Sequence, residues 1–151
     1  MSLEDEISLL ANIPVLAELD EEALRVLAFS TDTRNLQTGD LLIRRGDRSD
    51  GGYFVLSGSL TLFRDSPDET NVRVVGIGGL IGEMAMIAPT ECSISAAARE
   101  PTSVLRIPRS LFQRVLREYP GSAARLRAHI EKRLNEFTTD LETMRKTKLE
   151  S

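Results

Sequence analysis

The stretch that decides the fold of this chain runs from residue 76 to residue 98 and reads GIGGLIGEMAMIAPTECSISAAA. Three glycines interrupt a valine-rich run there, and Gly82 then precedes a short apolar segment, Met84 to Ile87, which Pro89 ends. Glycine lets backbone N–H groups turn toward a ligand, and the first amides of a helix suit a phosphate. A carboxylate such as Glu83 can accept hydrogen bonds from sugar hydroxyls. The spacing therefore predicts a cradle for a small anion that carries a sugar.

The same Gly-Glu pair also has a plain structural interpretation, since acidic residues favour helix N-termini in general. The surrounding chain separates the two interpretations. Turn dipeptides recur after residue 31, and short runs rich in β-forming residues lie between them. These runs are Leu41 to Ile43, Tyr53 to Leu56, Leu60 to Phe63, Val72 to Val75, Ile94 to Ala98 and Ser103 to Ile107. Such spacing is typical of an antiparallel roll or barrel, and we expect a jelly-roll-like antiparallel β-roll of about eight strands.

Helical patterns flank the β region on both sides. Ser2 and Asp5 have the spacing of a capping box, and Asp20 is expected to cap a second short helix. The apolar face of that second helix comprises Ala23, Leu24, Leu27 and Ala28. Pro108 introduces a third helix, and a longer helix is expected from Ser122 nearly to the end of the chain. We therefore expect a mainly β fold with two short N-terminal helices, a short helix in the cradle and a long C-terminal helix.

These elements divide the chain into three segments of one structural domain. N-terminal helices occupy residues 1–30, the β-roll ligand-binding core occupies residues 31–108, and C-terminal helices occupy residues 109–151. A length of 151 residues, of which 41% are apolar, suits one globular domain with its own core.

The last expected helix carries an apolar stripe at steps of four and three residues. The stripe comprises Ile130, Leu134, Phe137, Leu141 and Met144. These steps are typical of a two-stranded coiled coil, so we expect a homodimer through the C-terminal helix. The alternative is a helix that packs the same residues against its own domain, and we expect the stripe to do both.

Composition and charge restrict the classes of function. The 19 basic and 23 acidic residues give a net charge of −4, which does not indicate a nucleic-acid surface. One cysteine excludes an internal disulfide, and a single histidine, His129, removes most histidine-based metal sites. No apolar run approaches the roughly 18 residues of a membrane span, and no signal-peptide core follows Met1. We expect a cytoplasmic protein that is not an enzyme, requires no cofactor and binds neither membrane nor nucleic acid.

The order of two helices, β-roll, cradle and closing helices resembles the cyclic nucleotide-binding domain of catabolite activator protein relatives, kinase regulatory subunits and nucleotide-gated channels. The resemblance extends from about Leu9 to Phe137 and rests on several short motifs. These are Leu9-Leu10 to Leu27, Thr38-Gly39-Asp40, Arg45-Gly46-Asp47, Tyr53 to Gly58, Gly82-Glu83-Met84-Ala85 and Ile107 to Phe112. The resemblance implies a regulatory roll that binds a cyclic nucleotide.

What the resemblance implies for the site follows its motifs residue by residue. Glu83 takes the role of the carboxylate that binds the ribose 2′-hydroxyl. The residues around Glu83, whose backbone amides meet the cyclic phosphate in the family, are Gly82, Met84 and Ala85, with Leu80 and Ile81 as weaker ligand contacts. The family's last helix closes over the base, and the alignment makes Arg133 and Thr138 further weak candidates. Phe137 either stacks on the base or fills the stripe, and we favour the stripe.

The chain departs from the family motif at its cation. The motif ends the cradle with an arginine, which neutralises the phosphate, and a small hydroxyl residue, but the aligned pair here is Cys92-Ser93. Cysteine is an uncharged, weak donor, and losing one charge-assisted hydrogen bond weakens binding roughly ten- to a hundredfold. Arg73 and Arg99 lie nearby in sequence, and we expect both to be solvated charges rather than replacements. We expect Cys92 to be a small inert thiol, with a reactive sensing thiol as the alternative.

The sequence favours a sensor module that binds cyclic AMP or cyclic GMP and couples binding to movement of the C-terminal helix. The alternative is a roll that has lost its ligand and serves as a protein-interaction or dimerisation module, which Cys92 favours. A metal-dependent jelly-roll enzyme needs clustered histidines, which this chain lacks. No helix-turn-helix follows the last helix before Ser151, so we expect no direct DNA binding by this chain.

Overall fold

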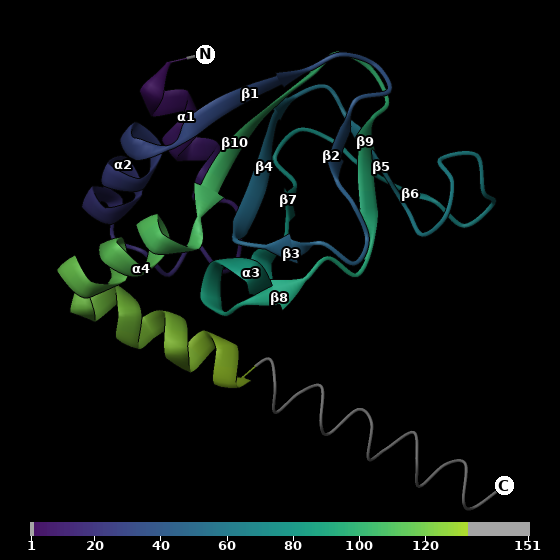
Figure 1. Cartoon of the computed structure of the whole chain (residues 1–151). Coiled ribbons are helices and arrows are strands. Elements are labelled where there is room, and N and C mark those ends of the chain that lie inside the picture. The colour runs from purple at the N-terminus through teal and green to yellow at the C-terminus, as the bar shows by residue number, and fades with distance from the viewer. Residues whose placement is uncertain (1, 133–151) are drawn as a thin grey trace, which may run out of the picture.

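The computed structural model describes residues 2–132 of the 151-residue chain. In that part the chain forms a β-roll with most of its helices gathered along one side (Figure 1). The labelled helices are α1 (Leu3–Leu10), α2 (Glu21–Ser30), α3 (Glu83–Ile87) and α4 (Arg109–Glu118). A further helix covers residues 120–132. The expected mainly β fold with flanking helices is confirmed.

The strands form two four-stranded antiparallel sheets and a small two-stranded sheet. The first sheet has the order β1-β10-β4-β7, with β1 (Asp32–Leu36), β10 (Thr102–Pro108), β4 (Gly51–Ser57) and β7 (Leu80–Ile81). The second sheet has the order β2-β9-β5-β6, with β2 (Leu41–Ile43), β9 (Ser95–Ala98), β5 (Leu60–Phe63) and β6 (Arg73–Val75). The small sheet pairs β3 (Arg48–Ser49) with β8 (Thr90–Glu91). The two larger sheets face each other across the interior of the roll (Figure 1).

The described part contains ten strands, somewhat more than the sequence pattern indicates, and the reason is local. β3, β7 and β8 have two residues each, which is too short to show alternation. β1 reads DTRNL and is polar apart from its last residue. It pairs along its whole length with β10, from Asp32 opposite Arg106 to Leu36 opposite Thr102. Tertiary pairing, not β propensity, therefore makes β1 a strand.

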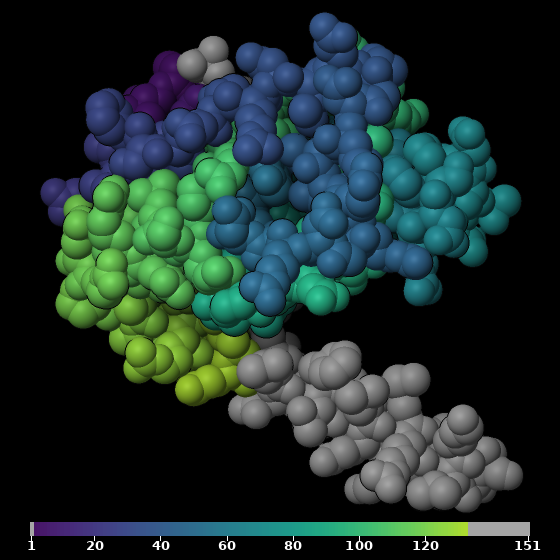
Figure 2. All heavy atoms as spheres, in the orientation of Figure 1, coloured from purple at the N-terminus to yellow at the C-terminus, as the bar shows by residue number. Residues whose placement is uncertain are grey.

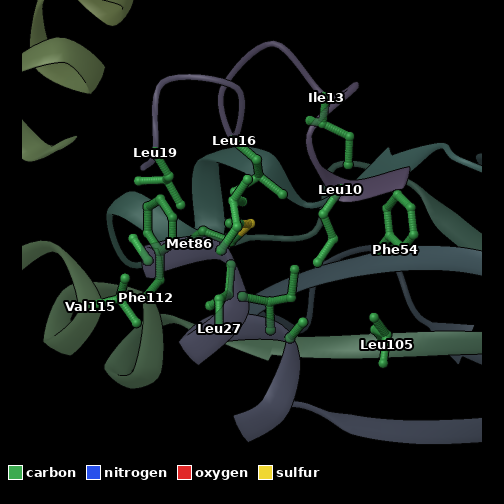
Figure 3. Close-up of a cluster of buried hydrophobic side chains, with 14 of the residues drawn as sticks. Leu10, Ile13, Leu16, Leu19, Leu27, Phe54, Met86, Leu105, Phe112 and Val115 are labelled. Atoms are coloured by element: carbon green, nitrogen blue, oxygen red, sulfur yellow. The ribbon is translucent and has the colours of Figure 1, made fainter. Parts of the chain in front are cut away.

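β4 and β10 are buried on both faces, and their alternating side chains divide the core into two clusters. On β4, Phe54 faces the helices, whereas Tyr53 and Val55 face the interior of the roll. The helix-side cluster comprises the buried residues of α1, α2, α4 and the loop between α1 and α2, together with Phe54, Leu56, Met86, Leu105, Ile107 and Leu126 (Figure 3). The roll-interior cluster comprises Tyr53, Val55, Leu60, Leu62, Ile81, Ala96 and Val104.

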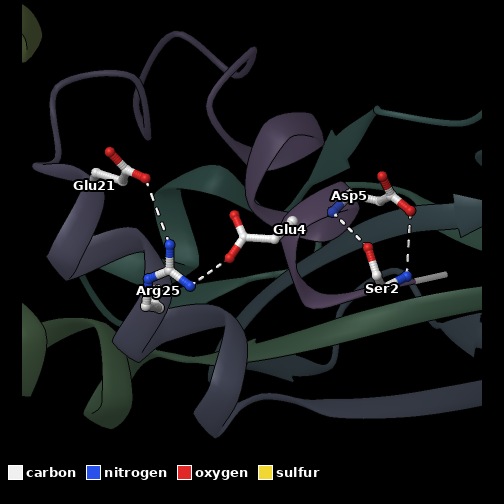
Figure 4. A network of polar contacts seen from close by, with 5 residues as sticks. All are labelled: Ser2, Glu4, Asp5, Glu21 and Arg25. Atoms are coloured by element: carbon white, nitrogen blue, oxygen red, sulfur yellow. Dashed lines mark hydrogen bonds and ion pairs between the residues drawn. The ribbon is translucent and has the colours of Figure 1, made fainter.

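The first helix begins with the predicted capping box. Ser2 Oγ accepts a hydrogen bond from the Asp5 N–H at 3.2 Å, and Asp5 Oδ2 accepts one from the Ser2 N–H at 3.3 Å (Figure 4). Beside the box, Arg25 of α2 donates to Glu4 of α1 at 2.5 Å and lies 3.5 Å from Glu21. The hydrogen bond with Glu4 is the main cause that raises the pKa of Arg25. These exposed contacts orient α1 on α2, while burial in the helix-side cluster supplies most of the stability.

Asp20 stands at the N-cap position of α2, but its side chain makes no capping hydrogen bond. Its carboxylate pairs instead with Arg125 of the 120–132 helix, and its N–H donates to Ser122 Oγ at 2.9 Å. The predicted side-chain cap is therefore wrong, because a cation from the C-terminal helix competes for the carboxylate. The same contacts hold the start of α2 against that helix.

Candidate ligand-binding site

Gly82 forms the turn between β7 and α3, and its backbone requires glycine. Its φ of +77° lies in the left-handed region, where an L side chain is strained. A Cβ at this position would also meet the carbonyl oxygen of Gly51 at 2.9 Å. The absence of a side chain therefore allows α3 to start close against β4, at the wall of the roll.

α3 holds the other cradle residues in different environments. Glu83 and Met84 are its first residues, so their N–H groups have no acceptor within the helix. The N–H of Ala85 already donates to the Gly82 carbonyl at 3.0 Å. Glu83 is half-buried, the Met84 side chain is 58% exposed, and Ala85 is fully buried. Ala85 thus contributes a buried wall to the cradle, and its N–H is already bonded within the turn.

A cavity of about 350 Å³ lies beside α3 and is lined by residues of all three sheets. This volume falls in the range of small-molecule sites, roughly 300–1,000 Å³. The predicted ligand residues that line it are Leu80, Ile81, Gly82, Glu83, Met84, Ala85, Cys92 and Ser93. The fold therefore brings together every predicted ligand residue that lies within residues 2–132.

Other lining residues come from strands that the sequence-based prediction of the site did not include. Tyr53 of β4 and Leu62 of β5 supply apolar surface, Ser49 of β3 supplies a hydroxyl, and Arg73 of β6 supplies a guanidinium. Arg73 is exposed, as expected of a solvated charge, but it also lines the cavity. The signal that could have found it is the pairing register of β6, which sequence spacing does not reveal.

Few of the described residues that line the cavity are charged. Glu83 and Glu91 are acidic, and Arg73 is basic. Arg99, the second arginine expected to be a solvated charge, is exposed and lies outside this lining. The cavity thus combines neutral donors near α3 with one guanidinium on β6.

Cys92 lies half-buried in the cavity wall. Its backbone is held on both sides, because its N–H donates to the Asp47 carbonyl at 2.8 Å and its carbonyl accepts from the Gly46 N–H at 2.8 Å. Burial raises the pKa of the Cys92 thiol, against a smaller lowering by a hydrogen bond with Ser49. A raised pKa keeps the thiol protonated at neutral pH, which favours the inert thiol over the reactive one.

Arg109, at the start of α4, reaches the back of the cradle. Its Nη1 donates to the carbonyl oxygens of Ser49 and Ala85, both at 3.4 Å. Its N–H donates to the Asp50 carbonyl at 2.6 Å. One residue thus connects β3, α3 and α4. The sequence placed Arg109 in a family motif but assigned it no contact.

The C-terminal candidates divide into one described residue and several outside the described part. Ile130 is partly buried and packs against the helix-side cluster, so its contact is with its own domain. The candidates outside the described residues are Arg133, Leu134, Phe137, Thr138, Leu141 and Met144. Pairing of the stripe with a second chain stays a prediction.

Within residues 2–132, no three side chains among histidine, cysteine, aspartate and glutamate gather closely enough to hold a metal ion. His129 instead faces Glu18, whose Oε1 lies 3.5 Å from the His129 Nδ1. None of the helices in that part of the chain has the length and apolar character that a bilayer crossing requires.

Residues 33–119 match the sequence pattern described as the cyclic nucleotide-binding domain. The chain is 33% identical over 121 residues to the cyclic AMP receptor protein of Thermus thermophilus, covering 78% of this chain and 56% of that protein. It is 30% identical over 127 residues to a lysophospholipase of Neurospora crassa, covering 83% of this chain but only 8% of that protein. The crystal structure of the N-terminal domain of a transcriptional regulator from Streptomyces coelicolor superimposes with a TM-score of 0.80 at 30% identity, over 88% of this chain and 94% of that one.

Proposed function

The chain belongs to the cyclic nucleotide-binding domain family, and from this premise we propose that the cavity beside α3 binds cyclic AMP or cyclic GMP. The observation that supports the proposal best is the composition of that cavity, which collects the predicted ligand residues from β7, α3 and the segment before β9. The family is a regulatory binding domain rather than a catalytic one. We propose that the chain itself acts by binding.

Each polar group of the cradle has a role in this proposal. Glu83 accepts a hydrogen bond from the ribose 2′-hydroxyl, which a half-buried carboxylate does more strongly than a neutral acceptor. The N–H groups at the start of α3 and the hydroxyl of Ser93 donate to the phosphate oxygens. Leu62 and Ile81, both buried in the roll-interior cluster, offer apolar surface to the rest of the ligand.

The proposal includes a route from the ligand to the C-terminal helix. Met86 on α3 lines a groove together with Leu116 of α4 and Ile130 of the 120–132 helix. Arg109 adds a polar link, since it bonds the Ala85 carbonyl from the first residue of α4. A shift of α3 on binding therefore changes the surface on which the C-terminal helix rests. The ligand drives this change by binding one arrangement more tightly than the other.

Isothermal titration of the whole chain with cyclic AMP and with cyclic GMP tests the binding. We expect heat from at least one nucleotide, and Glu83→Ala should weaken that binding about tenfold or more. Glu118→Ala removes an exposed carboxylate of α4 outside the cavity lining and is the matched control. Silence from both nucleotides at millimolar concentration would end the proposal.

Hydrogen exchange of residues 120–132 tests the coupling. Protection of these amides should change when the nucleotide is added, because their helix rests on the groove beside α3. The same protection with and without bound nucleotide contradicts the coupling while leaving the binding intact.

Cys92 favours a second candidate function, in which the roll has lost its ligand and acts as a protein-interaction or dimerisation module. The variant Cys92→Arg separates the two candidates. A wild-type chain without nucleotide affinity, together with a Cys92→Arg chain that gains it, would support the second candidate over the first. We also propose a homodimer through the C-terminal stripe, and a monomer mass in light scattering at high protein concentration would contradict it.

A further inference from the structure

We infer that Arg73 of β6 is the cation that binds the anionic group of the ligand in the cavity beside α3. The inference rests on the proposed function, because it assigns the charge partner of the same ligand. Arg73 lies on β6, whereas Cys92, the position at which the family motif has its arginine, lies between β8 and β9.

The charge of the cavity lining requires such a cation. Among the described lining residues, Glu83 and Glu91 are acidic and Arg73 is the single basic side chain. A cyclic nucleotide carries a negative charge, which a cation stabilises most at the short distances of a small cavity. Backbone N–H groups and the Ser93 hydroxyl are neutral donors, and their bonds are weaker than those of a charged donor. Arg73 is thus the described lining group that can compensate the charge of the ligand.

The strand register directs the Arg73 side chain toward the cavity. Arg73 lies opposite Leu62 of β5, and Leu62 in turn lies opposite Ala96 of β9. Residues directly opposite each other in antiparallel strands project from the same face of the sheet. Leu62 is 4% exposed and Ala96 is fully buried, and both belong to the roll-interior cluster. Arg73 therefore projects inward, whereas its neighbour Val74, which is 50% exposed, projects outward.

The position of β6 at the edge of its sheet lets Arg73 point inward and still contact water. The segment that carries it stands at the side of the roll, in teal (Figures 1 and 2). Its guanidinium takes part in none of the ion pairs between described residues, whereas Arg45 lies 3.6 Å from Asp65. A hydrated guanidinium at an open rim carries no burial cost before the ligand arrives.

The turn after β6 fixes this wall relative to the first sheet. The Gly78 N–H donates to the Val55 carbonyl at 2.9 Å, and the Val55 N–H donates to the Gly79 carbonyl at 2.9 Å. Both bonds join the turn to β4, whose Tyr53 lines the same cavity. The strand that carries Arg73 is therefore held by its pairing with β5 and by the hydrogen bonds of the turn that follows it.

Titration calorimetry of the whole chain tests the inference with two probes. One probe is the cyclic nucleotide that binds more tightly, and the other is its parent nucleoside, adenosine or guanosine, which has the same base and ribose but no phosphate. Arg73→Gln should weaken nucleotide binding about ten- to a hundredfold and leave nucleoside binding unchanged. Arg73→Lys should retain part of the nucleotide affinity, because lysine keeps the positive charge but lacks the planar guanidinium with its paired donors. Arg99→Gln, at an exposed arginine outside the lining, should change neither affinity.

A double variant checks that the loss is one of charge. Adding Cys92→Arg to Arg73→Gln supplies a cation at the position of the family's arginine and should restore nucleotide affinity. The thermal unfolding midpoint of the ligand-free Arg73→Gln chain should match that of the wild type, since the side chain is exposed.

The outcomes distinguish failure of this inference from failure of the proposed function. Equal nucleotide affinities of the wild type and Arg73→Gln overturn the inference and leave the proposed function standing. If Arg73→Gln weakens nucleotide binding and nucleoside binding equally, the inference is also overturned. Arg73 would then contact the base or the ribose, or would support the fold. If the wild-type chain binds neither cyclic nucleotide, both the proposed function and the assignment of Arg73 are overturned.

Discussion

The two clusters of the core differ in the number and size of the side chains that they bury. The helix-side cluster closes around large side chains, and Leu10, Phe54 and Phe112 are fully buried in it. The roll-interior cluster is smaller, and three of its members, Tyr53, Leu62 and Ile81, line a cavity of about 350 Å³. Both clusters share β4 and β10. The contrast teaches that dense packing on one face of a sheet can support a roll whose other face keeps room for a ligand.

The largest effect should come from a side chain deleted on the helix side. Phe112→Ala should lower the free energy of unfolding by about 3–5 kcal/mol, because it removes a fully buried ring and leaves a cavity. Urea denaturation followed by circular dichroism measures the loss. Phe29→Ala deletes the same ring from a position on α2 that is 81% exposed, and its effect should stay within about 0.5 kcal/mol. Similar losses in the two variants would remove the contrast.

A smaller effect is expected at the cavity wall, where Gly82 turns the chain into α3. Gly82→Ala should cost about 1–3 kcal/mol of unfolding free energy, because its φ is positive and its Cβ would meet the Gly51 carbonyl. Gly39→Ala is the matched control, since Gly39 has a φ of +90° but nothing within 4 Å of its Cβ. The difference between the two losses measures the close approach of β4 to the turn. If Gly39→Ala lowers the free energy of unfolding by as much, the close contact between Gly82 and the Gly51 carbonyl contributes nothing.

The next prediction concerns the capping box at the start of α1, beside the helix-side cluster. Ser2→Ala should lower the free energy of unfolding by about 1 kcal/mol, since it leaves the Asp5 N–H without its acceptor. Ser2→Asn keeps a side-chain oxygen at the N-cap and should retain most of the stability. Urea midpoints of the three chains measure both effects. A loss of several kcal/mol would mean that the box, and not burial, holds α1 in the helix-side cluster.

The smallest effect concerns Cys92 on the roll side. Burial raises the pKa of its thiol above the ordinary 9.0, so the folded chain keeps a proton that the unfolded chain releases first. The resulting stabilisation is complete below the unfolded pKa and is lost as the pH rises through the folded pKa. Iodoacetamide should therefore alkylate the folded chain more slowly than the urea-unfolded chain near pH 9. Equal rates would contradict the burial of the thiol.

Local signals in the sequence predicted much of the fold. The capping box of Ser2 and Asp5 forms as its spacing indicated, and the six β-forming runs overlap β2, β4, β5, β6, β9 and β10. β1 had no such signal, because a polar pentapeptide becomes a strand only when β10 pairs with it. Asp20 had a misleading signal, because its partner Arg125 lies far along the chain.

The candidate site shows the same division between local and distant contacts. The residues from Leu80 to Ala85 are neighbours in sequence, so one turn and one short helix suffice to gather them. Arg73 joins them only through the pairing of β6 with β5, which no spacing in the sequence specifies.

The sequence by itself determined the order of most elements, because caps, glycine turns and hydrophobic periodicity act over a few residues, and its motifs indicated the family and the candidate members of the cradle. The tertiary structure alone decided which face Arg73 presents to the cavity and which cation takes the carboxylate of Asp20. Both depend on how distant segments pair, and a shift of one residue in a strand register would turn every side chain to the other face. Local sequence patterns therefore predict the candidate residues of the site, and the pairing of distant strands decides which other residues lie beside them.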